Sequence, residues 1–166
     1  MSTIAFLFLF LHVLGAIAVF GPTFAFPLIG SMAAKNPPHG HFAALVTESI
    51  ERRIVLPGAV VQGITGVCLI LTVGLDITAS ANRWLIGGIT LYLIAISFAF
   101  FVQAKNAEKF VQMTAGGPPA GAPPAGAPAG PPPEIAAMAK KLQQGGMILT
   151  VLIVAIVLLM VTKPGF

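Results

Sequence analysis

The sequence predicts an all-α fold, a four-transmembrane-helix bundle, from its composition and from the grouping of its apolar residues. Of 166 residues, 57% are hydrophobic and only 8% are charged, whereas a soluble domain carries about 25% charged residues. The apolar residues form four blocks, each long enough to cross about 30 Å of hydrocarbon at about 1.5 Å per residue. Each block must be helical, because an unpaired peptide group in lipid is costly and a helix satisfies its own.

We predict four spans within a single membrane domain over residues 1–166, at about 4–27, 54–75, 84–104 and 145–162. The first is expected to be retained, since no basic residue precedes it and its apolar stretch outlasts a signal-peptide core. Pro57 lies one turn into the second span, where the missing backbone donor is expected to bend the helix.

On one side of the membrane the helices are expected to continue beyond the lipid. Residues 42–53 carry apolar side chains at helical spacing before the second span, residues 105–112 continue the third helix, and residues 134–144 lead into the fourth. Three prolines at 131–133 provide a start for that last stretch. Residues 115–133 contain only Ala, Gly and Pro, which predicts a disordered, flexible tether between the third and fourth helices.

The distribution of lysine and arginine predicts which side is cytoplasmic, because cytoplasmic loops near spans are enriched in them. Seven lie on one side, namely Lys35, Arg52, Arg53, Lys105, Lys109, Lys140 and Lys141. The other side has only Arg83 and Lys163. Both termini are therefore predicted to lie outside the cytoplasm, with Trp84 at the outer interface.

His12 is the candidate cofactor-binding residue, because ionisable side chains at membrane depth are rare and often functional. One hypothesis makes it an axial ligand to a haem or a metal. The other makes it a neutral imidazole that is hydrogen-bonded to a neighbouring helix or, near the outer interface, to water. No second ligand accompanies it at depth, since His39 and His41 lie in a cytoplasmic loop and Cys68 is the only cysteine. The sequence therefore predicts no dedicated metal site.

Two further groups of residues have expected structural roles. Glycines let helices approach closely, and five are candidate helix-packing positions: Gly15, Gly63, Gly66, Gly87 and Gly88. Before the second span, Glu48, Glu51, Arg52 and Arg53 are expected to form an interfacial charge cluster. Within it, Glu48 and Arg52 are four residues apart, the spacing of a helical ion pair.

The sequence carries none of the motifs that would indicate catalysis. It has no Ser/His/Asp arrangement, zinc-protease motif, phosphate-binding loop or dinucleotide fingerprint. We therefore predict no enzyme and no catalytic residue. The nine basic residues sit in short clusters beside apolar blocks and form no stripe, which argues against nucleic acid as a partner. Membrane lipids and other membrane protein subunits are the expected partners.

Several short motifs resemble those of DUF2269, a bacterial family of predicted four-span membrane proteins. They are LHVLGAI at 11–17, FGP at 20–22, RRIVLP at 52–57 and TG at 65–66. The resemblance covers most of the chain outside the Ala/Gly/Pro tract. It implies a four-helix protein of the bacterial cytoplasmic (inner) membrane and brings no established activity. More remotely, a first-span His with Gly three residues on is similar to copper-resistance D proteins and the haem-binding bacterial protoporphyrinogen oxidase, whose further polar span residues this sequence lacks.

Three functional hypotheses follow, in this order. The first is a non-enzymatic accessory or structural subunit of a larger respiratory or photosynthetic membrane complex, because tightly packing spans leave surface contacts as the main available function. The second is a haem- or metal-binding membrane redox protein that uses His12. The third is a small transporter, for which a polar path would have to come from Gln62, Thr65, Thr90, Tyr92 and Ser97. We expect no acidic residue inside the spans, which argues against ion coupling.

Overall fold

The computed structural model describes residues 2–116 and 131–164, and the regular elements within those ranges are all helical. The α-helices are α1 (Thr3–Phe20), α2 (Phe26–Lys35), α3 (Gly40–Ile50), α4 (Leu56–Val73), α5 (Arg83–Phe98), α6 (Ala104–Thr114) and α7 (Pro133–Thr162). Short 3-10 segments are η1 (Gly21–Ala25), η2 (Pro37–His39) and η4 (Ser80–Asn82), and π-helical turns are η3 (Glu51–Val55) and η5 (Ala99–Gln103).

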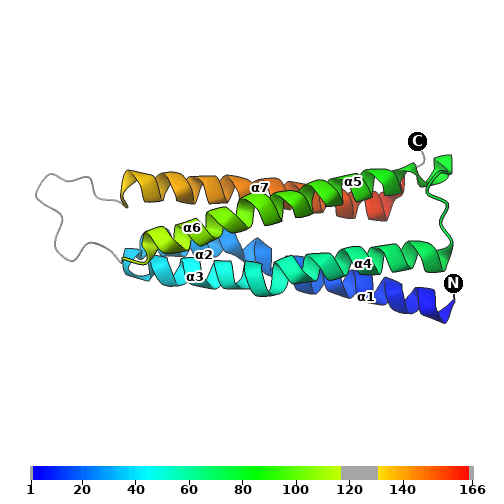
Figure 1. Ribbon diagram of the computed structural model, residues 1–166, viewed down its shortest axis with the longest axis horizontal. Helices are drawn as coiled ribbons and strands as arrows, with labels where there is room; N and C mark the ends of the chain where they lie inside the picture. Colours follow the sequence, from blue (N-terminus) through cyan, green and yellow to red (C-terminus); the bar gives the residue numbers. More distant parts are fainter. Residues whose placement is uncertain (1, 117–130, 165–166) are drawn as a thin grey trace, which may run out of the picture.

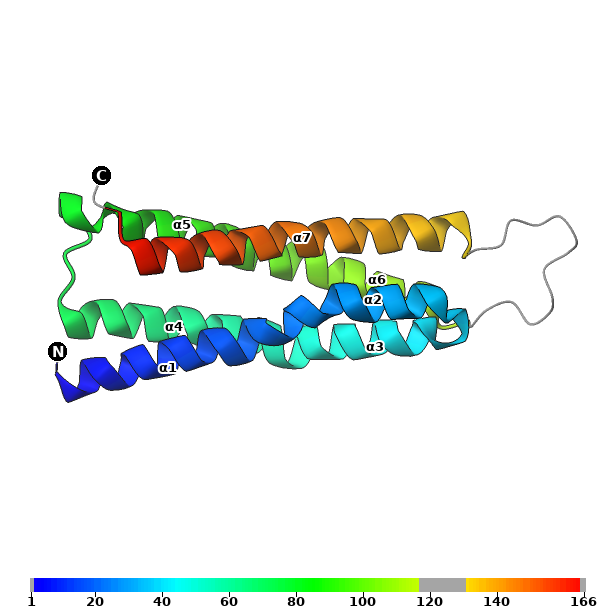
Figure 2. The same ribbon diagram turned by 180° about the vertical axis from the view of Figure 1, so that it is seen from behind.

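These elements join into four long helical rods, each long and apolar enough to cross a membrane: Thr3–Lys35, Pro37–Val73, Ser80–Thr114 and Pro133–Thr162. The predicted four-transmembrane-helix fold is thereby confirmed. The first two rods form the first hairpin, and the last two, which are called the second hairpin below, lie beside it. Within this arrangement α1 lies along α4, α5 along α7, and α3 along α6 (Figures 1 and 2). The start of α1 and the end of α7 lie at the same end of the bundle.

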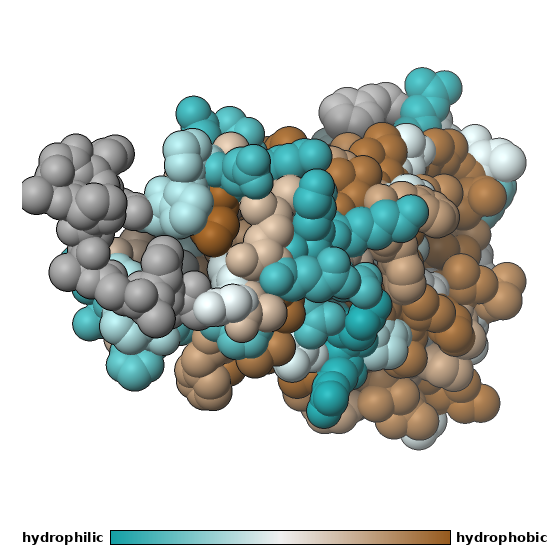
Figure 3. All heavy atoms as spheres, turned by 60° about the vertical axis from the view of Figure 1, so that its left-hand side comes forward, coloured by the Kyte–Doolittle hydropathy of each residue, from teal (hydrophilic) through white to brown (hydrophobic). Residues whose placement is uncertain are grey.

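Helical structure extends well beyond the apolar blocks at the other end of the bundle, as predicted for the second, third and fourth helices. The first rod does so too, because it continues past residue 27 through α2 to Lys35. Pro22 and Pro27 each lie at the first or second position of a new helical segment, where a missing N–H leaves no partner unsatisfied. Hydrophilic side chains gather around this end, whereas apolar ones cover the side of the bundle beyond it (Figure 3).

Two π-helical turns mark the places where the second and third rods pass from their extensions into the apolar blocks. In η3 the N–H of Leu56 donates to the Glu51 carbonyl, five residues back, directly before Pro57. Because Pro57 has no N–H, the helix has no α-type donor for the carbonyl four residues earlier, and the widened turn falls at this point. In η5 the N–H of Ala104 likewise donates to the Ala99 carbonyl. The second turn has no counterpart in the sequence prediction.

The connection between α4 and α5 is held by one glycine and one aspartate. Gly74 ends α4 in the left-handed region, with φ of 71°, a conformation that costs a residue with a side chain about 1 kcal/mol or more. The Asp76 carboxylate accepts hydrogen bonds from the Thr78 hydroxyl at 2.6 Å and the Thr78 N–H at 2.8 Å. These bonds favour the charged form and lower the pKa of Asp76 below its ordinary value.

Most of the predicted tether, residues 117–130, lies outside the described residues. Its flanks are described: α6 ends at Thr114, and α7 begins at Pro133 with a proline at its first position, as the prolines before this helix predicted.

Candidate functional site

The interior of the first hairpin contains a polar cluster that centres on His12 of α1. Its Nδ1 lies 3.1 Å from the Thr65 hydroxyl and 3.2 Å from the Gln62 amide nitrogen, both on α4. The same amide nitrogen donates to the His12 carbonyl at 2.8 Å, and the Thr65 hydroxyl donates to the Gln62 carbonyl at 3.0 Å. The imidazole is thus hydrogen-bonded to a neighbouring helix, which is the arrangement of the second hypothesis for this residue.

Two of the predicted helix-packing glycines make room for this cluster. A Cβ atom on Gly15 would lie 2.5 Å from the Gln62 Oε1 atom, and a Cβ atom on Gly66 would lie 3.2 Å from the His12 Cε1 atom. Each polar side chain therefore lies over a glycine of the opposite helix. The glycines at 15 and 66 set how closely α1 and α4 approach, and with it the hydrogen bonds between them.

The other three predicted glycines lie against side chains of α5 and α7. Gly63 of α4 lies beneath Tyr92 of α5, whose hydroxyl donates to the Ala59 carbonyl at 2.8 Å. This bond joins the two hairpins. Gly88 lies against the Met160 side chain and Gly87 against Leu159, both on α7. Gly58 of α4 likewise lies against Val19 of α1.

The structure divides the predicted interfacial charge cluster into two parts. Arg52 lies 3.5 Å from Glu48, as the spacing of four residues indicated, and 3.3 Å from Glu108 of α6. These two ion pairs are at the surface, so they contribute little to stability, and they join α3 to α6. Arg53 is exposed. Glu51, by contrast, is turned inward and only 8% exposed.

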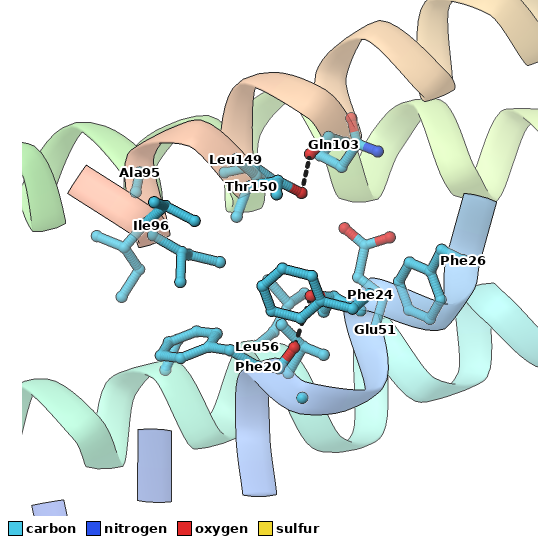
Figure 4. A pocket seen from close by; sticks show the side chains of 18 of the residues that line it. Phe20, Phe24, Phe26, Glu51, Leu56, Ala95, Ile96, Gln103, Leu149 and Thr150 are labelled. Atoms are coloured by element: carbon cyan, nitrogen blue, oxygen red, sulfur yellow. Dashed lines mark hydrogen bonds between the residues drawn. The ribbon is translucent and has the colours of Figure 1, made fainter. Parts of the chain in front are cut away.

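Glu51 lies on the wall of a cavity of about 2850 Å³ that lies between the two hairpins and is lined by residues of α1 through α7. Figure 4 shows part of the lining on both sides of the cavity. The first hairpin contributes Phe20, Phe24, Phe26, Glu51 and Leu56, and the opposite wall contains Ala95, Ile96, Gln103, Leu149 and Thr150. The Glu51 carboxyl points into this space. The lining is mainly apolar, and Glu51 is its acidic member among the described residues; the sequence had predicted this residue in an interfacial charge cluster.

Gln103, at the end of η5, is a second buried polar residue on the cavity wall, 8% exposed. Its amide nitrogen donates to the Leu142 carbonyl of α7 at 3.2 Å, and its Oε1 atom is buried against Gly145 without a donor among the described residues. Sequence reasoning missed both Gln103 and the inward direction of Glu51. The sequence did contain a signal for Glu51, namely its helical spacing from small or apolar residues. Ala44 precedes it by seven residues, Val55 and Ala59 follow it by four and eight, and all four lie on one buried helix face.

The described residues contain no group of three or more His, Cys, Asp or Glu side chains that could hold a metal ion. His41, on the same cavity wall, lies 3.1 Å through its Nδ1 atom from the Thr114 hydroxyl of α6. Trp84 was expected at the outer interface. Its side chain is only 7% exposed, and the Lys163 Nζ atom lies over its ring, 5.8 Å from the ring centroid.

Four helical rods that are each long and apolar enough to cross a membrane define an integral membrane protein. The family model for DUF2269, described as a predicted integral membrane protein, matches residues 6–164. The chain therefore belongs to the DUF2269 family, as its motifs indicated. No curated protein and no solved structure matches the chain.

The contact between Gly15 and Gln62 generates a stability prediction. Alanine at position 15 would place its Cβ atom against the Gln62 side chain and separate α1 from α4, so Gly15→Ala is expected to destabilise the protein by about 1–3 kcal/mol. The measurement is thermal unfolding of the purified protein in detergent.

Gly30→Ala in α2 is the matched control, because nothing lies within 4 Å of the added methyl group. It is expected to be neutral or slightly stabilising, since alanine favours a helix over glycine. Equal behaviour of the two variants would contradict the close contact at Gly15.

Proposed function

We propose that the protein is a non-enzymatic accessory subunit of a larger membrane assembly of the respiratory or photosynthetic kind. The observation that carries the proposal is the exposure of the first and fourth rods, in whose most apolar stretches only 6% of residues are buried inside the protein. Lipids contact these faces, and a neighbouring membrane protein would pack on the same surfaces. Together, Thr3–Phe20 and Pro133–Thr162 offer two long apolar sides of the bundle.

The interior polar groups support the same proposal. His12, Gln62 and Thr65 bond to one another, and the Tyr92 hydroxyl bonds to the backbone of α4. These bonds hold helices together, which is the task of a structural component. The transporter hypothesis stays a prediction; Thr90, one of its candidate groups, is exposed and bonds to its own helix at Ile86.

Site-specific photo-crosslinking in native membranes tests the proposal. A benzophenone-bearing phenylalanine at Leu14 of α1 or Val151 of α7, which are 47% and 67% exposed and do not line the cavity, is expected to form adducts with one discrete membrane protein. The same residue in place of Trp84, which is buried, is the control and is expected to form none. Mass spectrometry identifies the adducts. Lipid adducts alone at both exposed positions, with a monomeric purified protein, would refute the subunit role.

For its orientation we propose that the chain lies in the bacterial inner membrane with both ends outside the cytoplasm, on the support of the lysine and arginine distribution. In a Cys68→Ser background, Lys163→Cys is expected to react with a membrane-impermeant maleimide in spheroplasts. Lys141→Cys is expected to react only after permeabilisation. The reverse pattern of labelling would overturn this orientation.

Haem binding through His12 is a second candidate, and one specific observation favours it. The Thr65 hydroxyl oxygen, 3.1 Å from Nδ1, can accept a hydrogen bond from an Nδ1–H group while its own proton goes to the Gln62 carbonyl. In this tautomer the Gln62 amide nitrogen donates to the His12 carbonyl and not to Nδ1. That tautomer leaves the Nε2 lone pair for a metal and orients the ring, as partners of ligating histidines do.

An absorption spectrum of the protein purified from haem-replete cells tests this candidate. A Soret band that is lost in His12→Ala and weakened in Thr65→Val is expected if His12 ligates haem. A protein without a Soret band, or a band that survives His12→Ala, would exclude the assignment.

A further inference from the structure

Glu51 is the one acidic side chain that the described structure directs into the cavity between the hairpins. It is 8% exposed, and no described residue donates a hydrogen bond to its carboxyl or lies within ion-pair distance of it. The neighbouring Arg52 is paired with Glu48 and Glu108 at the surface. Lys140 also lines the cavity but forms no ion pair with Glu51.

A carboxyl group in a mainly apolar cavity with no hydrogen-bond donor from the chain is unfavourable, because polar groups in apolar surroundings are generally hydrogen-bonded. Glu51 therefore calls for a donor that enters the cavity from outside the chain.

The residues around Glu51 indicate the chemical class of the ligand that would donate this hydrogen bond. Phe20, Phe24 and Phe26 are on the same side as the carboxyl, and Thr150 lies across the cavity (Figure 4). Aromatic faces suit a flat ring, which they contact in offset or edge-to-face arrangements. Leu56, Ile96 and Leu149 add aliphatic side chains to the lining.

The size of the cavity indicates a long ligand. Its volume of about 2850 Å³ exceeds the roughly 300–1,000 Å³ of pockets for drug-sized ligands. A phospholipid would bring its phosphate beside the Glu51 carboxyl, where like charges repel. An uncharged head group with a hydroxyl donor avoids this repulsion.

We propose that the cavity binds a hydroquinone-headed lipid with a long apolar tail, with a ring hydroxyl donating to Glu51 and the tail along the apolar walls. The ring lies among the three phenylalanines, and the Thr150 oxygen faces it from the second hairpin. This site is independent of the accessory role proposed above, because it is formed within one chain.

Binding is measured with the full chain in phosphatidylcholine nanodiscs, titrated with a decyl-tailed benzohydroquinone under reducing conditions and analysed by native mass spectrometry. Saturable binding of one molecule per chain is expected. Glu51→Gln keeps the shape but replaces a charge-assisted hydrogen bond with a neutral one, so affinity is expected to fall about tenfold. Glu48→Gln, whose side chain pairs with Arg52 outside the cavity, is the matched control and is expected to change affinity less than about twofold.

A steric pair of variants on one helix gives a second measurement. Ala95 lines the cavity, whereas Ile94 beside it is 52% exposed on the outer face. Ala95→Phe is expected to abolish binding, and Ile94→Phe to leave it unchanged. Circular dichroism and size-exclusion profiles establish that each variant is folded.

Several results would overturn the proposal: no binding by the folded wild type, equal affinity of wild type and Glu51→Gln, or binding unaffected by Ala95→Phe. Displacement of the hydroquinone by phosphatidylglycerol at equal concentration would assign the cavity to phospholipid instead. Since the purified chain is used alone, these outcomes leave the crosslinking test of the accessory role untouched.

Discussion

Lipid offers no hydrogen bonds, and this constraint governs both the backbone and the polar side chains of the protein. The backbone meets this constraint by forming four helical rods, in which the peptide groups hydrogen-bond to one another. The side chains answer it by pairing across helices: His12 with Gln62 and Thr65 within one hairpin, and Tyr92 with the backbone of α4 between hairpins. A polar group that finds no such partner therefore stands out, and Glu51 is in that position.

At three close contacts between helices of this bundle, a polar side chain lies over a glycine. Gln62 lies over Gly15, His12 over Gly66, and Gln103 over Gly145. In each case the missing Cβ atom lets an amide or imidazole reach the opposite helix, so packing and hydrogen bonding are set together. Such pairs hold α1 on α4 and η5 on α7, and the space between the hairpins remains as the cavity.

The two proposals use different surfaces of one scaffold. The accessory role uses the exposed apolar sides of the first and fourth rods, whereas the lipid site uses the inner walls. The π turn at Glu51 lies where the second rod passes into its helical extension, and the neighbouring Arg52 pairs with Glu108 of α6. A ligand held by Glu51 would thus lie next to the point where the two hairpins are tied together.

The sequence by itself determined the fold class, the four apolar rods and the helical extensions, because hydrocarbon thickness and peptide desolvation act on local composition. It also indicated the Glu48–Arg52 pair, which depends only on helical spacing. Only the tertiary structure decided that His12 meets Gln62 and Thr65, that Gln103 is buried, and that Glu51 turns inward. The physical reason is that these outcomes depend on how each helix is rotated about its axis, and that rotation is set by contacts between residues far apart in the chain.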